Sequence, residues 1–275
     1  MQNAIAEDIN SGDHSSLSTI PKESKVEAIM LCKDEGIIAG INRAEDIFHF
    51  YDPSISITKH FKDGDKVTFG DTLLSLNGNA RNILAMERIA LNVMQRMSGI
   101  ATYTAYLNNK IKHTSTKILD TRKTTPVIRF LEKEAVVIGG GKNHRMGLYD
   151  MIMIKDNHVD FSGGISIAID KANEYIKSNQ LDIKIEVEVR NFEELQTVLS
   201  KGQVHRIMLD NFCVGDLKEA IKRINHQYET EASGGINENT IVHYAETGVD
   251  YISVGALTHT VKNFDISLIA KPHEQ

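Results

Sequence analysis

The sequence predicts an α/β protein with a small N-terminal α+β domain and a larger α/β barrel. Up to about residue 100, short β-prone runs alternate with Gly-Asp turns at 64–65 and 70–71, without a repeating strand-helix rhythm. From residue 117 onward, short apolar runs recur at intervals that can hold helices, which is typical of parallel strands joined by right-handed crossovers. We therefore expect an N-terminal domain over residues 1–100 and a barrel domain over residues 101–261.

A long helix is expected to begin near residue 82, at the end of the first domain. Apolar residues recur there at offsets of seven, four and three, the spacing of a buried helical stripe: Ile83, Ala90, Met94 and Met97. At about 100° per residue, Arg88 points about 140° away from Ile83. Its charge therefore leaves the stripe and can reach a site outside its own domain, although a solvated helix arginine is the simpler alternative.

Seven apolar runs are expected to form the strands of the second domain: KILDT, EAVVI, MIMIK, KIEVEV, RIMLD, ETEAS and YISVG. Nearly every run ends in a polar or charged residue or in a Gly-rich turn. A doubly wound sheet is the alternative architecture. The barrel is preferred because the carboxyl ends of all its strands converge on one mouth, where such enzymes place their catalytic groups.

Composition excludes several classes of protein. The 275-residue chain has a net charge of −6, which argues against general nucleic-acid binding. No run of eighteen apolar residues and no secretory leader pattern is present, so we expect a cytoplasmic protein without a membrane span. Cys32 and Cys213 lie far apart without nearby metal-ligand partners, and we expect both to be buried, inert thiols.

Two Gly-rich turns follow the last two predicted strands. They are SGGIN, which contains Ser233, Gly234 and Gly235, and SVGAL, which contains Gly255. In α/β barrels these loops commonly bind phosphate, because glycine permits close backbone approach and N–H groups at a helix start favour an anion. A phosphate site is therefore predicted, with plain tight turns as the alternative.

A cationic segment follows the first three predicted strands. Residues 117–158 contain eight Lys and Arg against five Asp and Glu, within an otherwise acidic chain. The groups at the strand ends are Arg122, Lys123, Lys142, His144, Arg145 and Lys155. Arginine matches a planar carboxylate and lysine supplies a compact charge, so the set suits a substrate with several carboxylates and phosphates. A Schiff-base lyase using Lys123 or Lys155 is another reading.

Acids in apolar strands form the other half of the predicted site. Glu186 and Glu188 share one face of their strand, and Asp210 ends the next strand. Such carboxylates can bind a ribose hydroxyl, hold Mg²⁺ on a diphosphate or stabilise a sugar cation electrostatically. For Glu186, a structural salt bridge to Lys155 or Lys184 is an equally good interpretation. His158, in the Asp-Asn-His trio that follows Lys155, is expected to order its loop.

Several longer strings together resemble the quinolinate phosphoribosyltransferases: ERIALNVMQRMSGIAT, ILDTRKTTPVIR, GGGKNHRMGLYDMIMIKDNH, EVEV, IMLDN, SGGIN and YAETGVDYISVGALTH. The similarity runs from about residue 7 to residue 269. It implies an N-terminal sandwich and an incomplete, seven-stranded α/β barrel of TIM-like type. The C-terminal tail, residues 262–275, is expected to pack back on the first domain.

The resemblance implies transfer of a phosphoribosyl group from 5-phosphoribosyl 1-diphosphate to quinolinate. The products are nicotinate mononucleotide, carbon dioxide and pyrophosphate, and the expected cofactor is Mg²⁺, held through the diphosphate and by Glu188 and Asp210 as candidate ligands. Substrate contacts are carried over by motif to these positions: Arg88, Thr121, Arg122, Lys123, His144, Arg145, Lys155, Glu188, Asp210, Ser233, Gly234, Gly235, Val254, Gly255 and Ala256. The catalytic candidates among them are Lys123, Lys155, Glu188 and Asp210.

The same resemblance implies a homodimer in which Arg88 enters the neighbouring subunit's site. Assembly of such dimers into a hexamer is left open. Two alternatives share the fold: a pyrophosphorylase-like protein of a molybdate operon, and a phosphate-ligand sensor built on an inactive barrel. The full cationic set argues against the first alternative, and the presence of Glu188 and Asp210 argues against the second.

Overall fold

The computed structural model describes residues 1–271, which divide by their contacts into two compact units. The first unit contains residues 1–105, 131–140 and the C-terminal segment from residue 261, and the second contains residues 106–130 and 141–260. The predicted boundary between residues 100 and 101 remains a prediction. Of the predicted tail, residues 272–275 lie outside the described residues.

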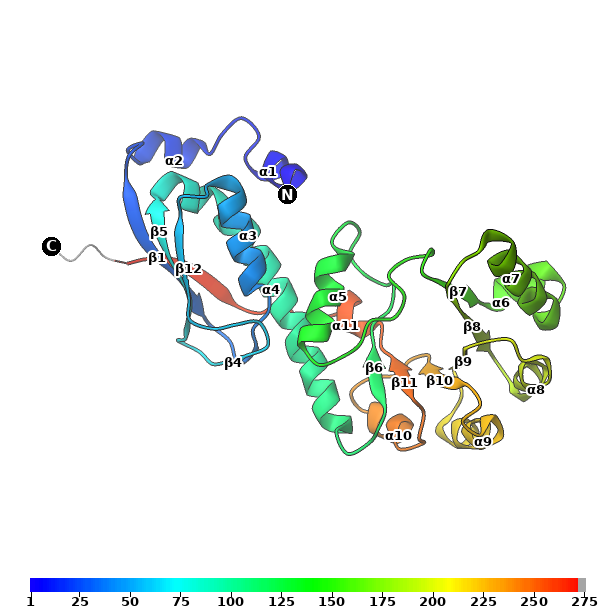
Figure 1. Ribbon diagram of the computed structural model, residues 1–275. Helices are drawn as coiled ribbons and strands as arrows, with labels where there is room; N and C mark the ends of the chain where they lie inside the picture. Colours follow the sequence, from blue (N-terminus) through cyan, green and yellow to red (C-terminus); the bar gives the residue numbers. More distant parts are fainter. Residues whose placement is uncertain (272–275) are drawn as a thin grey trace. The chain divides into compact units, whose positions relative to one another are not determined.

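The first unit is built on a four-stranded antiparallel sheet in the order β12-β1-β5-β3 (Figure 1). Its strands are β1 (Lys25–Cys32), β3 (Ser56–Lys59), β5 (Thr72–Asn79) and β12 (Ile266–Ala270), and a separate pair joins β2 (Gly36–Ile37) to β4 (Lys66–Val67). The helices are α1 (Gln2–Asp8), α2 (His14–Thr19), α3 (Ile41–Tyr51), α4 (Ala80–Ile111, in this unit up to residue 105) and α5 (Arg129–Ile138, in this unit from residue 131).

Strand β12 brings the end of the described chain back to its beginning. It pairs antiparallel with β1, with Met30 opposite Leu268. The predicted stripe of α4 is confirmed, because Ile83, Ala90 and Met94 are fully buried and belong to the same hydrophobic cluster as the inner faces of β1 and β5.

Phe48 on α3 is among the largest fully buried side chains of this core. We expect Phe48→Ala to lower the free energy of unfolding by about 3–5 kcal/mol, because it removes an aromatic side chain from a closely packed site. Phe50, on the same helix, is 53% exposed, so Phe50→Ala should change stability by less than about 0.5 kcal/mol. Urea unfolding of both variants measures the difference, and equal losses would contradict this view of the core.

The second unit is a six-stranded parallel sheet in the order β6-β11-β10-β9-β8-β7. The strands are β6 (Lys117–Leu119), β7 (Met151–Ile154), β8 (Lys184–Val189), β9 (Arg206–Asp210), β10 (Glu229–Ser233) and β11 (Tyr251–Ser253). The helices are α6 (Asp156–Ser162), α7 (Ile165–Asn179), α8 (Phe192–Lys201), α9 (Val214–Ile224), α10 (Ile241–Ala245) and α11 (Ala256–His259). Figure 1 shows α7 to α10 on the outer side of the strands.

The predicted α/β class is confirmed, but one of the seven predicted strands is wrong. The EAVVI run is part of helix α5, where the buried residues Leu131, Ala135 and Val136 follow helical spacing. In place of a strand formed by EAVVI, an isolated parallel bridge pairs Lys142 with Leu119 of β6. Among the described residues, β6 and β7 are the two end strands of the ladder, so its hydrogen bonds do not close into a full barrel.

The two cysteines differ in exposure. Cys32 is buried as predicted, whereas Cys213 is exposed and its Sγ accepts a hydrogen bond from Asp216 N at the start of α9. The prediction of two buried thiols is therefore wrong for Cys213, which occupies a helix cap.

In residues 1–271, no helix combines the length and the apolar character that a membrane crossing requires.

Candidate active site

A cavity of about 720 Å³ lies at the carboxyl ends of the parallel strands in the second unit. This is the end at which α/β barrels place their catalytic groups. Thirteen of the predicted residues line it: Thr121, Arg122, Lys123, His144, Arg145, Lys155, Glu188, Asp210, Ser233, Gly234, Gly235, Gly255 and Ala256. The structure therefore brings together cations, acids and Gly-rich turns from six different strand ends.

Three predicted positions lie elsewhere in the described chain. Val254 is buried, and its main-chain N–H donates to Leu119 O. Lys142 is exposed and is not among the residues that line the cavity. Arg88 belongs to α4 in the first unit, and its side chain is 59% exposed.

The cavity also contains residues that sequence reasoning missed. They include Glu231, Asn211 and His259, together with Met153, Met208, Ile236 and Ser253. Period-two alternation along ETEAS places Glu231 on the same face as Ser233, which was already a candidate. That alternation could have identified Glu231 from the sequence.

Lys155 and Glu188 form an ion pair within the cavity. Lys155 Nζ donates to Glu188 Oε2 at 2.8 Å, and the Glu188 side chain is only 10% exposed. The main-chain N–H of Lys155 donates to Nδ1 of His158, which confirms the predicted loop-ordering role of that histidine. A substrate anion that binds Lys155 would therefore compete with the carboxylate of Glu188 for the Lys155 ammonium group.

Asp210 is held by donors on both carboxylate oxygens. Ser233 Oγ donates to Oδ1 at 2.6 Å, and Asn211 Nδ2 donates to Oδ2 at 2.7 Å. Asn211 adopts a left-handed conformation with φ of 57°, which asparagine tolerates better than most residues. Gly234 makes room for it, because a Cβ at that position would lie 2.1 Å from Asn211 Oδ1.

His144 lies in the cavity wall with its ring edge turned into the protein. Its Nε2 is 2.9 Å from Glu186 Oε2 and 3.3 Å from Glu231 Oε2, and all three side chains are at most 5% exposed. Arg206 Nη1 approaches Glu231 Oε2 at 3.1 Å, so Glu186 and Glu231 share this guanidinium rather than Lys155 or Lys184. The predicted salt bridge of Glu186 to either lysine is therefore wrong.

Burial and mutual repulsion set the charge of this group. Burial raises the pKa of Glu186 to about 7, and the neighbouring carboxylate of Glu231 acts in the same direction. Burial alone would lower the pKa of His144, but hydrogen bonds to Glu186 and Glu231 outweigh it and raise that pKa to about 9. A proton on Nε2 of His144 is therefore strongly favoured.

The arginines of the cavity repel one another. Burial lowers the pKa of Arg145, and the nearby charge of Arg122 lowers that pKa further. Such a pair is relieved by an anionic ligand that lies between the two guanidinium groups.

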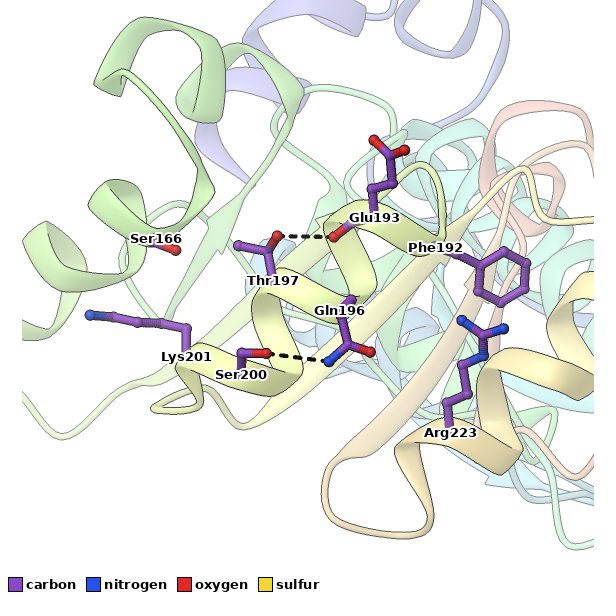
Figure 2. A pocket seen from close by; sticks show the side chains of 8 residues that line it. All are labelled: Ser166, Phe192, Glu193, Gln196, Thr197, Ser200, Lys201 and Arg223. Atoms are coloured by element: carbon purple, nitrogen blue, oxygen red, sulfur yellow. Dashed lines mark hydrogen bonds between the residues drawn. The ribbon is translucent and has the colours of Figure 1, made fainter.

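A second hollow lies on the outer helices of this unit and has a different chemistry. Figure 2 shows its lining residues on α7, α8 and α9. Its volume of about 730 Å³ matches that of the cavity at the strand ends, so size alone does not identify the site. Its Arg223 guanidinium lies 4.4 Å from the Phe192 ring centroid, and Thr197 Oγ1 donates to Glu193 O within the same helix. The gathered cations and acids distinguish the strand-end cavity.

Comparisons with known proteins show the family of the chain. Residues 13–98 match the model of the quinolinate phosphoribosyl transferase N-terminal domain, and residues 100–269 match that of its C-terminal domain. A mitochondrial quinolinate phosphoribosyltransferase [decarboxylating] 2 of Nicotiana glauca is 48% identical over 283 residues, covering 98% of this chain and 80% of the relative. A probable nicotinate-nucleotide pyrophosphorylase [carboxylating] of Bacillus subtilis is 42% identical, covering 95% of this chain and 89% of the relative.

A solved structure extends the similarity to the fold. The nicotinate-nucleotide pyrophosphorylase from Francisella tularensis superposes with a TM-score of 0.91 and 38% identity, covering 98% of this chain and 94% of the other. Both family models together span almost the whole chain. The chain therefore belongs to the quinolinate phosphoribosyltransferase family.

Proposed function

We propose that this chain joins quinolinate to the phosphoribosyl group of 5-phosphoribosyl 1-diphosphate and produces nicotinate mononucleotide, carbon dioxide and pyrophosphate for NAD biosynthesis. The observation that carries this proposal is that one cavity gathers three kinds of group: Arg122, Lys123 and Arg145, which we call its cationic side; Glu188 and Asp210, which we call its acidic side; and two Gly-rich turns. A dicarboxylate, a ribosyl cation and a phosphate need these three environments, respectively.

The cationic side binds quinolinate in this proposal. Arg122, Lys123 and Arg145 hold its two carboxylates, and the dianion relieves the repulsion between the arginines. Thr121 shapes this side, because its Oγ1 accepts a hydrogen bond from Lys123 N. His144 was also predicted to bind a carboxylate, but both of its ring nitrogens have protein neighbours, so we assign it to the cavity wall.

The Gly-rich turns bind the 5′-phosphate in this proposal. Ser233, Gly234 and Gly235 form one side of the phosphate cradle, and Gly255 and Ala256 form the other. A Cβ at Gly255 would lie 3.0 Å from Lys123 Cδ and 3.1 Å from His259 Cδ2, so a side chain there would crowd the cavity. Lys155 lines the same cavity, and in this proposal its charge contacts the diphosphate or the quinolinate.

The acidic side acts on the bond that breaks. Departure of pyrophosphate leaves positive charge on ribosyl C1 and the ring oxygen, which Glu188 and Asp210 stabilise while the pyridine nitrogen attacks from the opposite face. Ser233 and Asn211 hold the Asp210 carboxylate in place without removing its charge. The negative field is therefore fixed before the reaction begins.

Decarboxylation follows from the charge on the ring. Once the pyridine nitrogen carries the ribosyl group, it is cationic and stabilises the electron pair left at the adjacent carbon when carbon dioxide departs. That carbon then takes a proton, which completes the ring of nicotinate mononucleotide. A buried position for the departing carboxylate favours loss of its charge, so no separate decarboxylating cofactor is required.

Magnesium fits the acidic side of the cavity. Glu188 and Asp210 offer carboxylate oxygens, the ligands that Mg²⁺ prefers, beside the expected diphosphate. When bound, the ion would neutralise diphosphate charge. The ligand atoms of His144, Glu186 and Glu231 also lie within 4.8 Å of one another, but Arg206 already supplies a positive charge to the two acids. We therefore place Mg²⁺ with the diphosphate.

Gly234→Ala should weaken binding of phosphoribosyl diphosphate. The new Cβ would lie 2.1 Å from Asn211 Oδ1 and 3.0 Å from Asn211 N, so the turn or the Asp210 support must shift. We expect the KM for phosphoribosyl diphosphate to rise about 10-fold or more. Gly235→Ala is the matched control, because its Cβ meets no atom within 4 Å and only the positive φ of 62° is strained. Equal effects of the two substitutions would contradict the proposed cradle geometry.

We also propose a homodimer in which Arg88 completes the site of the neighbouring subunit, with a hexamer of such dimers as a further assembly. Four large apolar side chains that come shortly after Arg122, Arg145 and Lys155 in the chain are 70–90% exposed. They are Val127, Leu148, Tyr149 and Phe161. A partner subunit that covered these side chains would remove apolar surface from water, which favours association. The exposed Arg88 then serves as the partner's contribution to the cationic side.

Subunit mixing tests the shared site. Arg88→Ala and Glu188→Gln should each inactivate the homodimer, and mixing them should form heterodimers in which one site keeps both native residues. Because about half of the dimers are mixed and each holds one intact site of two, activity should recover to about one quarter of the wild-type value. The measurement is activity after unfolding and co-refolding of the two variants. No recovery in confirmed heterodimers would place Arg88 in its own subunit's site, and an active Arg88→Ala homodimer would place Arg88 outside any site.

We propose a cytoplasmic location on composition alone. Two plant relatives are named as a mitochondrial and a chloroplastic protein, so an organelle is the alternative location that an experiment must test. Microscopy of the full chain with a C-terminal fluorescent fusion in its own cell tests it, and fluorescence confined to an organelle would contradict the proposal.

The substrate assignment is tested by incubating the purified chain with phosphoribosyl diphosphate, Mg²⁺ and either quinolinate or nicotinate. We expect nicotinate mononucleotide from quinolinate and none from nicotinate, because only quinolinate carries the second carboxylate that the cationic side requires. Product from nicotinate alone would contradict the assignment.

A further inference from the structure

The wall of the cavity encloses four buried ionisable side chains, of which only His144 has a role above. His144, Glu186, Arg206 and Glu231 are each less than 9% exposed. A buried ion-pair group of this kind is weak evidence for stability, because desolvation can outweigh the attraction between the charges. Their contacts instead lead from the two acids, through the ring of His144, to a residue of the substrate pocket.

The ring of His144 joins these acids to Arg145. Glu186 and Glu231 approach Nε2 at 2.9 and 3.3 Å, whereas the main-chain N–H of Arg145 donates to Nδ1 at 2.7 Å. A nitrogen that accepts an N–H must be unprotonated, and a nitrogen between two carboxylates must carry a proton. Both conditions are met by one form of the ring, the neutral imidazole with its proton on Nε2. The two carboxylates raise the pKa of His144 to about 9 and so favour a second proton at neutral pH, but that proton would have to sit on Nδ1, where the main-chain N–H of Arg145 already donates at 2.7 Å. We therefore give the hydrogen bond from Arg145 more weight and assign the neutral form.

Further contacts fix the same segment. The main-chain N–H of His144 donates to Oδ1 of the buried Asp120 at 2.8 Å. Arg145 Nη1 donates to Met151 O at 3.2 Å, so its guanidinium is held at one nitrogen while others remain for a ligand. The direction of the Arg145 side chain therefore depends on a main chain that His144 anchors.

We propose that Glu186 and Glu231 are positioning residues for quinolinate binding. They hold His144 in its Nε2–H form, so that Nδ1 anchors the main chain of Arg145 and orients its guanidinium into the substrate pocket. Arg206 makes the arrangement tolerable by placing a positive charge 3.1 Å from Glu231 and 3.9 Å from Glu186. This inference rests on the proposed assignment of Arg145 to quinolinate.

Nitrogen-15 NMR of the histidine-labelled full chain tests the ring state directly. The His144 signals are assigned by their loss in His144→Gln, and we expect one protonated and one unprotonated ring nitrogen at neutral pH, with the proton on Nε2. This measurement needs no substrate and no active enzyme, so it separates failure of this inference from failure of the proposed reaction. A doubly protonated ring, or a proton on Nδ1, would overturn the inference.

Kinetics of Glu186→Gln and Glu231→Gln provide the second readout. We expect the KM for quinolinate to rise about 10-fold to 100-fold, because a small displacement of a positioned group has effects of this size. The KM for phosphoribosyl diphosphate should change less than about 2-fold, and the proton distribution on the His144 ring should change in the same variants.

Glu229→Gln is the matched control. Glu229 contacts the same guanidinium, with Oε2 at 3.0 Å from Arg206 Nη2, but it is not an observed partner of His144. It should therefore leave the ring state and the KM for quinolinate unchanged. The inference is overturned if Glu186→Gln and Glu231→Gln behave like Glu229→Gln in both readouts, or if wild-type protein holds a stoichiometric metal ion that Glu231→Gln loses.

Discussion

Arg122→Ala is expected to abolish measurable binding of quinolinate while leaving binding of phosphoribosyl diphosphate largely intact. Arg122 lines the cavity and lies close enough to Arg145 for its charge to lower the pKa of that residue. Truncation removes a planar donor that carboxylates match, so the dissociation constant for quinolinate should rise about 100-fold or more. Titration calorimetry with each ligand separately measures the effect.

Lys142→Ala is the control for this prediction. Lys142 lies in the same cationic segment and carries one positive charge, but it is exposed and does not line the cavity. It should change quinolinate affinity less than about 2-fold, through long-range charge alone. If Lys142→Ala weakened quinolinate as much as Arg122→Ala, general charge and not a specific contact would explain binding.

Glu188→Gln is expected to lower kcat about 100-fold with small changes in the KM of either substrate. The substitution keeps the size of the side chain but removes the negative charge that faces the developing ribosyl cation, and fixed charges at such positions have effects of this order. It also removes the charged partner that Lys155 Nζ contacts at 2.8 Å, so the affinity for an anionic substrate should not fall. Steady-state kinetics with both substrates varied separates kcat from KM.

The nearby Glu193→Gln provides the comparison. Glu193 lies on α8, directly after the strand that carries Glu188, but its side chain lines the outer hollow of Figure 2. Removing that carboxylate should leave kcat within about 2-fold of the wild-type value. A higher KM with an unchanged kcat in Glu188→Gln would assign Glu188 to substrate binding and contradict its electrostatic role.

Much of the fold followed from local pattern. The stripe of α4 and the strands KIEVEV and RIMLD are predictable because their period and apolar content agree with burial. EAVVI failed because a short apolar run fits a buried helix as well as a strand. Contacts of neighbouring residues favour the helix: the fully buried Glu132 of α5 forms an ion pair with Arg96 of α4.

The candidate site was predictable where chemistry follows a strand end. Arg122, Lys155 and Asp210 could be identified because parallel strands bring such positions to one mouth. The partners of buried groups were not predictable, since pairing across neighbouring strands depends on register. Arg206 lies opposite Glu186 on β8 and Glu229 on β10, and this register places it within reach of Glu231.

In the proposed function, one cavity performs both ribosyl transfer and loss of the carboxylate beside the ring nitrogen. The most direct measurement uses quinolinate labelled in its 2-carboxylate, with phosphoribosyl diphosphate and Mg²⁺, and quantifies all three products of the purified chain. We predict equal amounts of nicotinate mononucleotide, pyrophosphate and labelled carbon dioxide, and no labelled carbon dioxide when the diphosphate substrate is left out. Retention of the label in the nucleotide product, or its release without phosphoribosyl diphosphate, would show that this cavity does not couple decarboxylation to ribosyl transfer.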